Sequence, residues 1–561
     1  MMAKHEMASG AIMNSRLSKA IRSAIKCGVP LALSIFGTVA VADDRDAKHE
    51  NPSGTVVPKA VCGREDHPET ALQGQVPAAL RAAGFKGFNC NLTLVAQSRN
   101  DGSNWQSAEF KDKRQERQGH GEDGDDRDRR SLHNCGYYGS ASANVSPATR
   151  NPATLGTRVV DLTEVNHPVL KGYLQSISML DPWESLKVNE PRQLLVSDQA
   201  ANGGGGPAID VYDISQDCRF PQLLASVPVG TGKDGGSLAP IAPIGHEGTF
   251  APDGLTYYIG DLPNKMYHAI DLTDPTAPRY LASFDMTVVG TGSHGLSVSD
   301  DGKRLYVAAL GNGTTLSNPD GPNNNGFAIL DVSEVQARTA NPQIKLVSSF
   351  LYKDGSIAQH TIPVTIKGRR YVIQVDEGGG GGIPSASQSW GQTCQAGITP
   401  FPTARIVDID NEKNPKLVSK LLLEMNDPAK CEQVIPDLVG LSVFSYGTHY
   451  CSVDNRHNAT TLACDEFNSG IRVFDIRNPE RPKEIAYFNP AGTTTASGGS
   501  NHVSFANWVA GGPDWCSAEI HLDAEAGTLW TTCQDNGLLV LKFERGVWPF
   551  KDSTTPPGAQ N

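Results

Sequence analysis

A short apolar run with one acidic residue recurs along the chain and sets its organisation. It reads RVVDLT around Asp161 and returns as DVYDIS, HAIDLT, AILDVS, RIVDID and RVFDIR. A seventh run, LLVLKF, carries Lys542 in the acidic position. Each run is rich in Val, Ile, Leu or Phe, which indicates a strand buried on at least one face. The pattern therefore predicts seven copies of one β unit.

A second apolar run follows each of the first six copies and begins at a proline, as in HPVLKGYL, APRYLASF and RPKEIAYF. Because proline suits the first residue of a strand, each pair of runs predicts a hairpin. Turns at Asp253-Gly254, Asp301-Gly302 and Lys367-Gly368 predict a further hairpin ahead of the repeated strand. The unit is thus four strands long, and closed stacking of such units makes a β-propeller.

The seventh copy lacks a last strand after LLVLKF, and the run NLTLVAQ from Asn91 resembles the missing one. We therefore predict an all-β, seven-bladed propeller of four-stranded antiparallel blades over residues 88–547, closed by strands from both termini. Residues 43–87 are predicted to form an arm or linker, and residues 548–561 a tail. A highly charged insertion at about 105–132 has no apolar pattern and is predicted to be disordered.

The first 42 residues have the features of a secretory signal. Lys19, Arg22 and Lys26 precede an apolar run from Val29 to Ala42 that ends in Ala-Val-Ala. This run is too short to span a bilayer, so we expect a periplasmic or secreted protein without membrane insertion. Removal of residues 1–42 takes away five basic residues and one acidic residue and lowers the formal charge from −12 to −16. Nucleic acid is then a poor partner, and we expect a monomer.

Ten cysteines remain after cleavage, an even number in an oxidising compartment, and this predicts disulfides. Cys451 with Cys464 and Cys516 with Cys533 flank predicted hairpins and are expected to pair. Cys90 with Cys135 is a candidate third pair, across the charged insertion. The remaining four cannot be paired from the sequence.

Five histidines occupy a similar place, at or near the start of the predicted innermost strand of a unit: His246, His294, His360, His449 and His502. In a propeller this place is the mouth of the central channel. Neutral imidazole suits copper, zinc or iron, and copper is the first choice because it heads the divalent affinity order. The alternative is that each histidine only pins its blade by hydrogen bonds.

Acidic residues end the predicted second strands and are expected to converge on the same funnel: Asp198, Asp261, Asp376 with Glu377, Asp465 with Glu466, and Asp535. Carboxylates can bind a metal or hold its histidines by hydrogen bonds. Glu247, beside His246, and Glu377 are the candidate acid–base groups.

The runs RVVDLT, RIVDID and RVFDIR, each followed by an Asn-Pro-like step, resemble the LVIVD-repeat family of secreted bacterial and archaeal β-propellers. The resemblance extends from about residue 88 to 545 and implies the fold but no single reaction. The layout is more distantly similar to copper-holding propellers such as selenium-binding proteins with methanethiol oxidase activity. No motif of this chain matches that enzyme residue by residue.

Two functions follow from these patterns. The first is a metal-binding funnel that oxidises or hydrolyses a small molecule. The second is a non-catalytic propeller whose long loops, such as 312–325 and 378–402, bind a protein, a glycan or a cell-surface partner.

Overall fold

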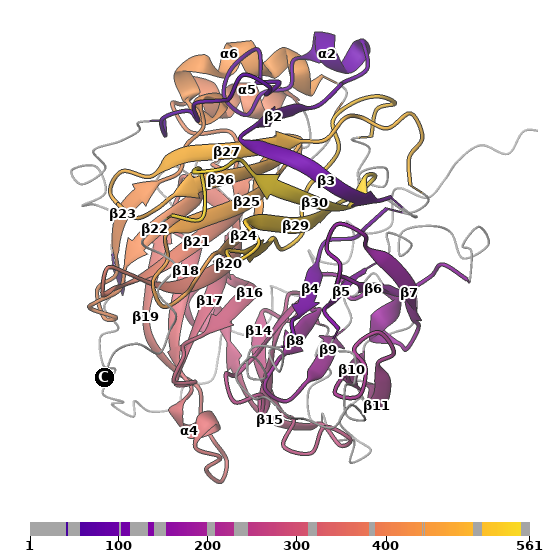
Figure 1. The fold of residues 1–561 in the computed structure, drawn as a ribbon. Coiled ribbons are helices and arrows are strands. Elements are labelled where there is room, and N and C mark those ends of the chain that lie inside the picture. Colours follow the sequence, from indigo (N-terminus) through magenta and orange to yellow (C-terminus); the bar gives the residue numbers. More distant parts are fainter. Residues whose placement is uncertain are drawn as a thin grey trace, which may run out of the picture. The chain divides into compact units, whose positions relative to one another are not determined.

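Seven β-sheets form a ring of blades in the computed structural model, which confirms the predicted propeller (Figure 1). They belong to one compact unit, Ala40–Asn561. Within every blade the neighbouring strands are antiparallel. The structure describes residues 41–42, 56–99, 102–112, 133–139, 153–198, 208–228, 245–311, 323–380, 387–439, 441, 444–497 and 508–550.

Each blade has four strands, and blades are numbered by their innermost strand. The innermost strands are β4 (Ser107–Phe110), β8 (Lys187–Asn189), β12 (Glu247–Phe250), β16 (Gly292–Val298), β20 (Gly355–Ile366), β24 (Tyr446–Val453) and β28 (His521–Asp523). The second strands are β5 (Cys135–Gly139), β9 (Leu194–Asp198), β13 (Thr256–Asp261), β17 (Arg304–Leu310), β21 (Arg369–Gly379), β25 (Thr461–Phe467) and β29 (Thr528–Cys533). The third strands are β6 (Thr157–Asp161), β10 (Ala208–Asp213), β14 (Met266–Asp271), β18 (Asn325–Asp331), β22 (Ala404–Asp408), β26 (Ile471–Asp475) and β30 (Gly537–Phe543). The outer strands are β7 (Val169–Leu174), β11 (Gln222–Pro228), β15 (Arg279–Asp285), β19 (Lys345–Tyr352), β23 (Lys416–Lys420), β27 (Lys483–Asn489) and β3 (Leu92–Ser98).

The ring closes as predicted, because β3 from the N-terminal part is the outer strand of blade 7. Leu92 pairs with Phe543 and Ser98 with Leu538, in antiparallel register. Two further short strands extend other blades: β2 (Phe88–Cys90) pairs with β27, and β1 (Val41–Ala42) runs parallel to β19. Strand β2 thus covers a strand edge that would otherwise be free, whereas β1 lies within the predicted signal.

The repeated acidic residue ends the third strand and turns the chain. Asp161 Oδ1 accepts a hydrogen bond from Thr163 N at 3.1 Å and from Thr163 Oγ1 at 2.7 Å. Asp271 with Thr273, and Asp331 with Ser333, repeat the contact. An aspartate that binds the chain two residues ahead makes a compact turn, which explains the Asp-x-Thr/Ser motif.

Short helices lie beside the strands. Figure 1 shows α2 (Ala78–Ala82), α5 (Ser387–Gln395) and α6 (Cys431–Val434) together at one end of the propeller. The other short helices are α4 (Ser333–Gln336) and the 3-10 turns η3 (Ser178–Leu180), η4 (Met286–Val288), η5 (Glu424–Asn426), η6 (Pro428–Lys430) and η7 (Ile435–Leu438). None of the described helices is long and apolar enough to cross a membrane.

The disulfides confirm two predicted pairs and correct the third. Cys451 bonds to Cys464 and Cys516 to Cys533. Cys90 and Cys135 do not pair with each other, because β2 lies on blade 6 and β5 lies in blade 1. The three other bonds are Cys62–Cys90, Cys135–Cys218 and Cys394–Cys431.

The hydrophobic core lies between neighbouring blades. Between blades 3 and 4, for example, Tyr258 and Ala269 pack in one cluster with Leu305 and Val307. Strand β4 falls inside the range predicted for the charged insertion, so the regular blade continues to at least Phe110. Residues 113–132 and the predicted signal up to residue 40 lie outside the described residues.

Candidate metal centre

The innermost strands bring three of the predicted histidines together at one end of the central channel. His246 directly precedes β12, His294 lies in β16 and His449 lies in β24. The ring centroids of His246 and His294 are 4.3 Å apart. Three different blades therefore contribute one imidazole each to a single cluster.

Two glutamates join these imidazoles. The Glu184 carboxylate lies 3.3 Å from His246 Nε2 and 3.2 Å from His449 Nε2. The Glu377 carboxylate lies 3.2 Å from His449 Nε2 and 3.8 Å from His294 Nε2. In two overlapping groups, Glu184 with His246 and His294, and Glu184 with Glu377 and His449, the candidate ligand atoms all lie within 4.8 Å of one another. We call these five residues the histidine cluster.

Backbone carbonyls orient two of the rings. His294 Nδ1 donates to the carbonyl oxygen of Gln359 at 3.1 Å, and His449 Nδ1 donates to that of Ser517. Because a carbonyl can only accept, each Nδ1 carries the proton and each Nε2 is turned towards the carboxylates. Among the described residues, the Nε2 atoms of His246 and His449 have no hydrogen-bond partner of normal geometry. Metal-binding histidines use the same division between their two ring nitrogens.

The cluster stabilises positive charge at its centre. Burial acts to raise the pKa of Glu184, but His246 and His449 outweigh burial and hold that pKa well below its usual value. Burial acts to lower the pKa of His449, yet the carboxylates of Glu184 and Glu377, each 3.2 Å from its Nε2, raise that pKa to about 10. At His294, burial and then the neighbouring His246 lower the pKa to about 3. Burial also raises the pKa of Glu377.

Glycines let the blades approach closely here. A Cβ atom at Gly295 would lie 2.0 Å from Glu247 Oε2 and 2.2 Å from the carbonyl oxygen of Gln359. A Cβ atom at Gly260 would lie 2.0 Å from the carbonyl oxygen of His294. Only glycine fits at these two positions, and this allows the three blades to bring their polar groups into contact.

An aromatic cover packs against the histidine cluster. It consists of Trp105, Trp183, Phe444, Phe467 and Trp515. The Trp105 ring centroid lies 5.0 Å from that of His449, and the Trp183 centroid lies 5.9 Å from that of His246. Trp183, Phe444 and Phe467 have φ values of 47°, 58° and 42°. A bulky residue in this region costs about 1–3 kcal/mol, and such strain is concentrated at functional sites.

His360, a fourth histidine of the predicted set, does not join the cluster. Strand β20 has a bulge between Ala358 and His360, and the extra residue puts Gln359 in the histidine position. Gln359 Nε2 donates to Glu184 at 2.7 Å. The His360 ring stacks instead on Tyr450 at 4.5 Å, and its Nε2 lies 3.2 Å from the carbonyl oxygen of Cys451.

The two remaining predicted site residues are Glu247 and His502. Glu247 is buried, burial raises its pKa well above the usual value, and it lines the channel together with His360. Glu247 therefore lies beside the histidine cluster but is not one of its five residues. His502 lies outside the described residues.

Most of the acids that end the second strands bind within or between blades, contrary to the expected convergence. Asp261 contacts His268 of β14 at 3.0 Å, and Asp465 accepts from Thr531 of β29 at 2.7 Å. Of the acids in that predicted set, only Glu377 belongs to the described histidine cluster.

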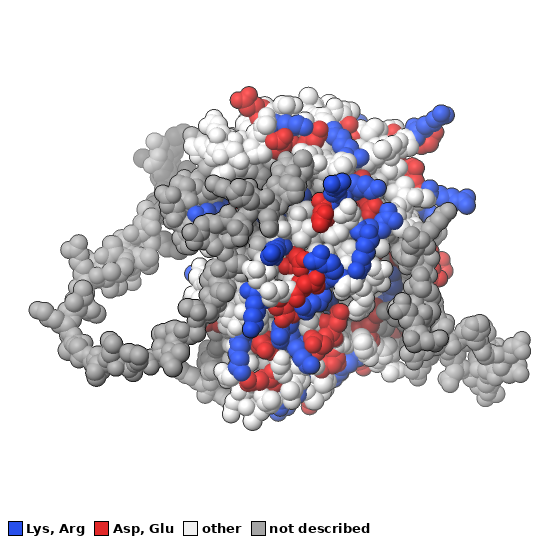
Figure 2. All heavy atoms as spheres, turned by 90° about the vertical axis from the view of Figure 1, so that its left-hand side faces the viewer, with Lys and Arg blue, Asp and Glu red and all other residues white. Residues whose placement is uncertain are grey.

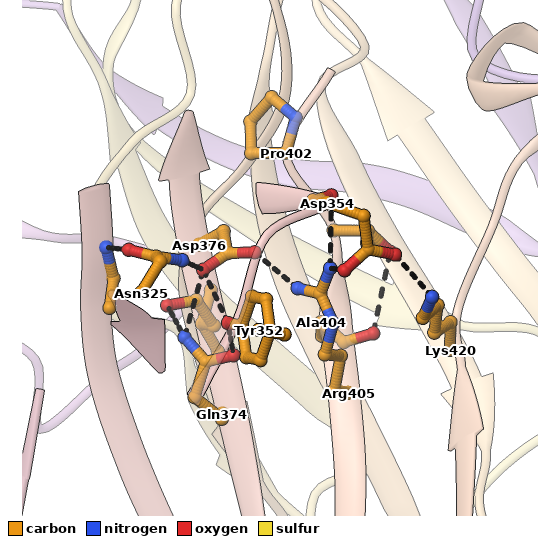
Figure 3. Close-up of polar contacts among 12 residues, drawn as sticks. Asn325, Tyr352, Asp354, Gln374, Asp376, Pro402, Ala404, Arg405 and Lys420 are labelled. Carbon is orange, nitrogen blue, oxygen red and sulfur yellow. Dashed lines mark hydrogen bonds and ion pairs between the residues drawn. The ribbon is translucent and has the colours of Figure 1, made fainter. Parts of the chain in front are cut away.

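Asp376 holds Glu377 in place. Its carboxylate pairs with the buried Arg405 and accepts hydrogen bonds from Tyr352 at 2.7 Å and Asn325 at 2.8 Å (Figure 3). These bonds fix the end of β21, and the next residue along that strand points its carboxylate to the imidazoles.

Glu184 was missed by the sequence reading. It lies before β8 in DPWESL, outside any repeated strand. No sequence signal marks it, because a loop has no repeating pattern that predicts where a side chain points.

No family model and no curated protein matches the chain. Two solved structures are similar in fold. One, a Lactobacillus plantarum protein, is 11% identical with a TM-score of 0.41, over 68% of this chain and 86% of that one. The other, a candidate 6-phosphogluconolactonase of Bacteroides uniformis, is 11% identical with a TM-score of 0.43, over 71% of this chain and 90% of that one. Similarity at this level concerns the fold alone.

Proposed function

We propose that the histidine cluster binds one transition-metal ion and uses it to transform a small molecule. The observation that supports this most is the orientation of the imidazoles. His294 and His449 give their Nδ1 protons to backbone carbonyls, and the Nε2 atoms face a shared pair of carboxylates. This arrangement leaves metal-binding nitrogens and negative charge at one point, and no Lys or Arg of the described residues forms an ion pair with Glu184 or Glu377.

The distances suit a small divalent ion. Bonds of about 2.0–2.2 Å at tetrahedral angles separate neighbouring ligand atoms by roughly 3.3–3.6 Å. The Glu184 oxygens lie 3.3 Å and 3.2 Å from the Nε2 atoms of His246 and His449. Three imidazoles with carboxylates can bind copper, zinc or iron, and copper remains the first candidate because of its affinity.

Hydrolysis is the reaction that the surroundings favour, with oxidation second. Glu377 borders a cavity of about 10 Å³, which is close to the room that one water molecule needs. A metal ion lowers the pKa of a bound water, and a carboxylate at hydrogen-bond distance can take its proton. Glu377 is our candidate for that base, and the aromatic cover limits the entry of further water.

Metal content tests this proposal. Protein purified from its native compartment is expected to contain one transition-metal ion per chain. His294→Ala should lose the metal, whereas His360→Ala should keep it, because both imidazoles are buried but only His294 faces the carboxylates. If wild type stays metal-free after incubation with copper, zinc and iron in turn, the cluster only stabilises the contact between blades through its ion pairs. The non-catalytic scaffold would then become the leading function.

A further inference from the structure

The central channel contains a second polar site, a chamber of about 350 Å³. Residues from all seven innermost segments line it, and among them are Glu247, His360 and Lys187. Glu247 follows His246 in the chain, so the chamber adjoins the histidine cluster while none of the five cluster residues lines it. Its volume lies at the small end of the range for ligand pockets.

Two buried polar atoms of this chamber have no hydrogen-bond partner of normal geometry among the described residues. They are Glu247 Oε2 and His360 Nδ1, in residues that are 2% and 4% exposed. His360 Nε2 lies 3.2 Å from the carbonyl oxygen and 3.4 Å from the backbone nitrogen of Cys451, so Nδ1 can donate or accept and needs a partner in either tautomer. A buried polar atom without a partner is unfavourable, so two at one cavity favour the binding of a polar ligand there.

A donor lies in the same chamber. Lys187 Nζ bonds Glu519 at 2.6 Å and lies 5.8 Å from the Tyr450 ring centroid. An ammonium has three N–H donors, and this geometry uses one of them. The chamber therefore offers both hydrogen-bond donors and acceptors. Leu296, Ile362 and Pro363 add apolar wall.

We propose that this chamber binds a small, neutral polyol of about monosaccharide size. A hydroxyl group donates and accepts at once, so one molecule can form hydrogen bonds with Glu247 and His360 and accept one from Lys187. The Glu519 carboxylate disfavours an anion, and the Lys187 ammonium disfavours a cation. The chamber is separate from the metal ligands, so this inference goes beyond the proposed metal chemistry and does not require it.

Isothermal titration calorimetry with glucose, sorbitol and myo-inositol tests this proposal, with putrescine and succinate as charged probes of similar size. We expect at least one polyol to bind wild type and His294→Ala alike, which separates this site from the metal centre. Lys187→Met should weaken binding roughly ten- to hundredfold, as expected for the loss of a charged hydrogen bond. His360→Phe keeps a ring that can stack on Tyr450 and should weaken binding as well.

Circular dichroism and thermal melts will show which variants fold. A crystal structure of wild type soaked with the best polyol provides a test that needs no variant, and the ligand should contact Glu247 and His360. The proposal is overturned if no polyol binds, if a charged probe binds better, or if the soaked ligand lies outside the chamber. Unchanged affinity in folded Lys187→Met and His360→Phe would also overturn it.

Discussion

Two buried clusters of charge meet at strand β21 of blade 5, where Asp376 belongs to one and Glu377 to the other, and they are built on opposite plans. Around Arg405 opposite charges are matched: the guanidinium contacts Asp376 and Asp354, and Lys420 also pairs with Asp354 (Figure 3). Arg405 also lies 3.8 Å from the Tyr352 ring centroid. In the histidine cluster two carboxylates meet three imidazoles, and two Nε2 atoms lack a hydrogen-bond partner among the described residues.

The difference in charge matching suggests different roles for the two clusters. A network whose charges are matched needs nothing further, so the Arg405 cluster serves to fix the end of β21. Burial of acceptors and ring nitrogens without partners is unfavourable in free energy. Binding of a cation would offset this unfavourable term. The adjacent residues Asp376 and Glu377 belong one to each cluster, so the Arg405 network holds one carboxylate of the histidine cluster in position.

Removal of Arg405 should give the largest effect. Arg405→Met leaves Asp376 and Asp354 without their shared cation, and loss of one partner from a buried ion pair costs about 3–5 kcal/mol. The free energy of unfolding from denaturant titration should fall by that amount. A loss below about 1 kcal/mol would show that the network is not needed for stability.

The metal centre should contribute nearly as much to stability, but only when metal is present. A ligand at a thousand times its Kd stabilises the folded state by about 4 kcal/mol. Chelator should therefore lower the melting temperature of metal-loaded wild type and of His360→Ala, and should leave His294→Ala unchanged. Equal sensitivity of both variants to chelator would remove the contrast between the two clusters.

The sequence predicted the fold better than the site, for physical reasons. Strands and turns depend on local patterns, and the repeated run with its aspartate revealed seven blades and the closing strand β3. The bulge that displaces His360 depends on how β20 packs between its neighbours. Cys62 pairs with Cys90 because the N-terminal segment returns to blade 6, and no local pattern encodes that path. Glu184 lies in a loop, where no repeating hydrophobic pattern predicts the direction of a side chain.

A third buried cluster, around Arg472, has a cation but also one unmatched acid. It should make the free energy of unfolding depend on pH. Arg472 bonds Glu484 at 2.8 Å and Glu69 at 2.7 Å, and a third acid, Glu466, is buried near them. Burial, with the repulsion of Glu484 and Glu69, raises the pKa of Glu466 to about 8 against the attraction of Arg472. The unmatched acid thus stays protonated near neutral pH.

The sign of this dependence follows from where the proton is bound. Between the usual glutamate pKa of 4.5 and the folded value of about 8, the folded chain holds a proton that the unfolded chain has lost. The free energy of unfolding should therefore fall as pH rises through this window, by at most about 1.4 kcal/mol per pH unit. Glu466→Gln should remove this part of the slope in unfolding titrations at several pH values. A slope unchanged by the substitution would contradict the assignment.

The smallest effect is expected at an arginine that, like Arg405, pairs with two aspartates but is exposed to water. Arg369, also in blade 5, contacts Asp408 and bonds Asp410 at 3.0 Å, yet its side chain is 57% exposed. Figure 2 shows one side of the molecule with acidic and basic side chains interspersed, a setting in which such pairs are hydrated and screened by salt. Arg369→Met should leave the denaturation midpoint nearly unchanged, and added salt should abolish any remaining difference from wild type. If Arg369→Met destabilised the protein as much as Arg405→Met, burial would not be what separates a matched structural network from an ordinary surface pair.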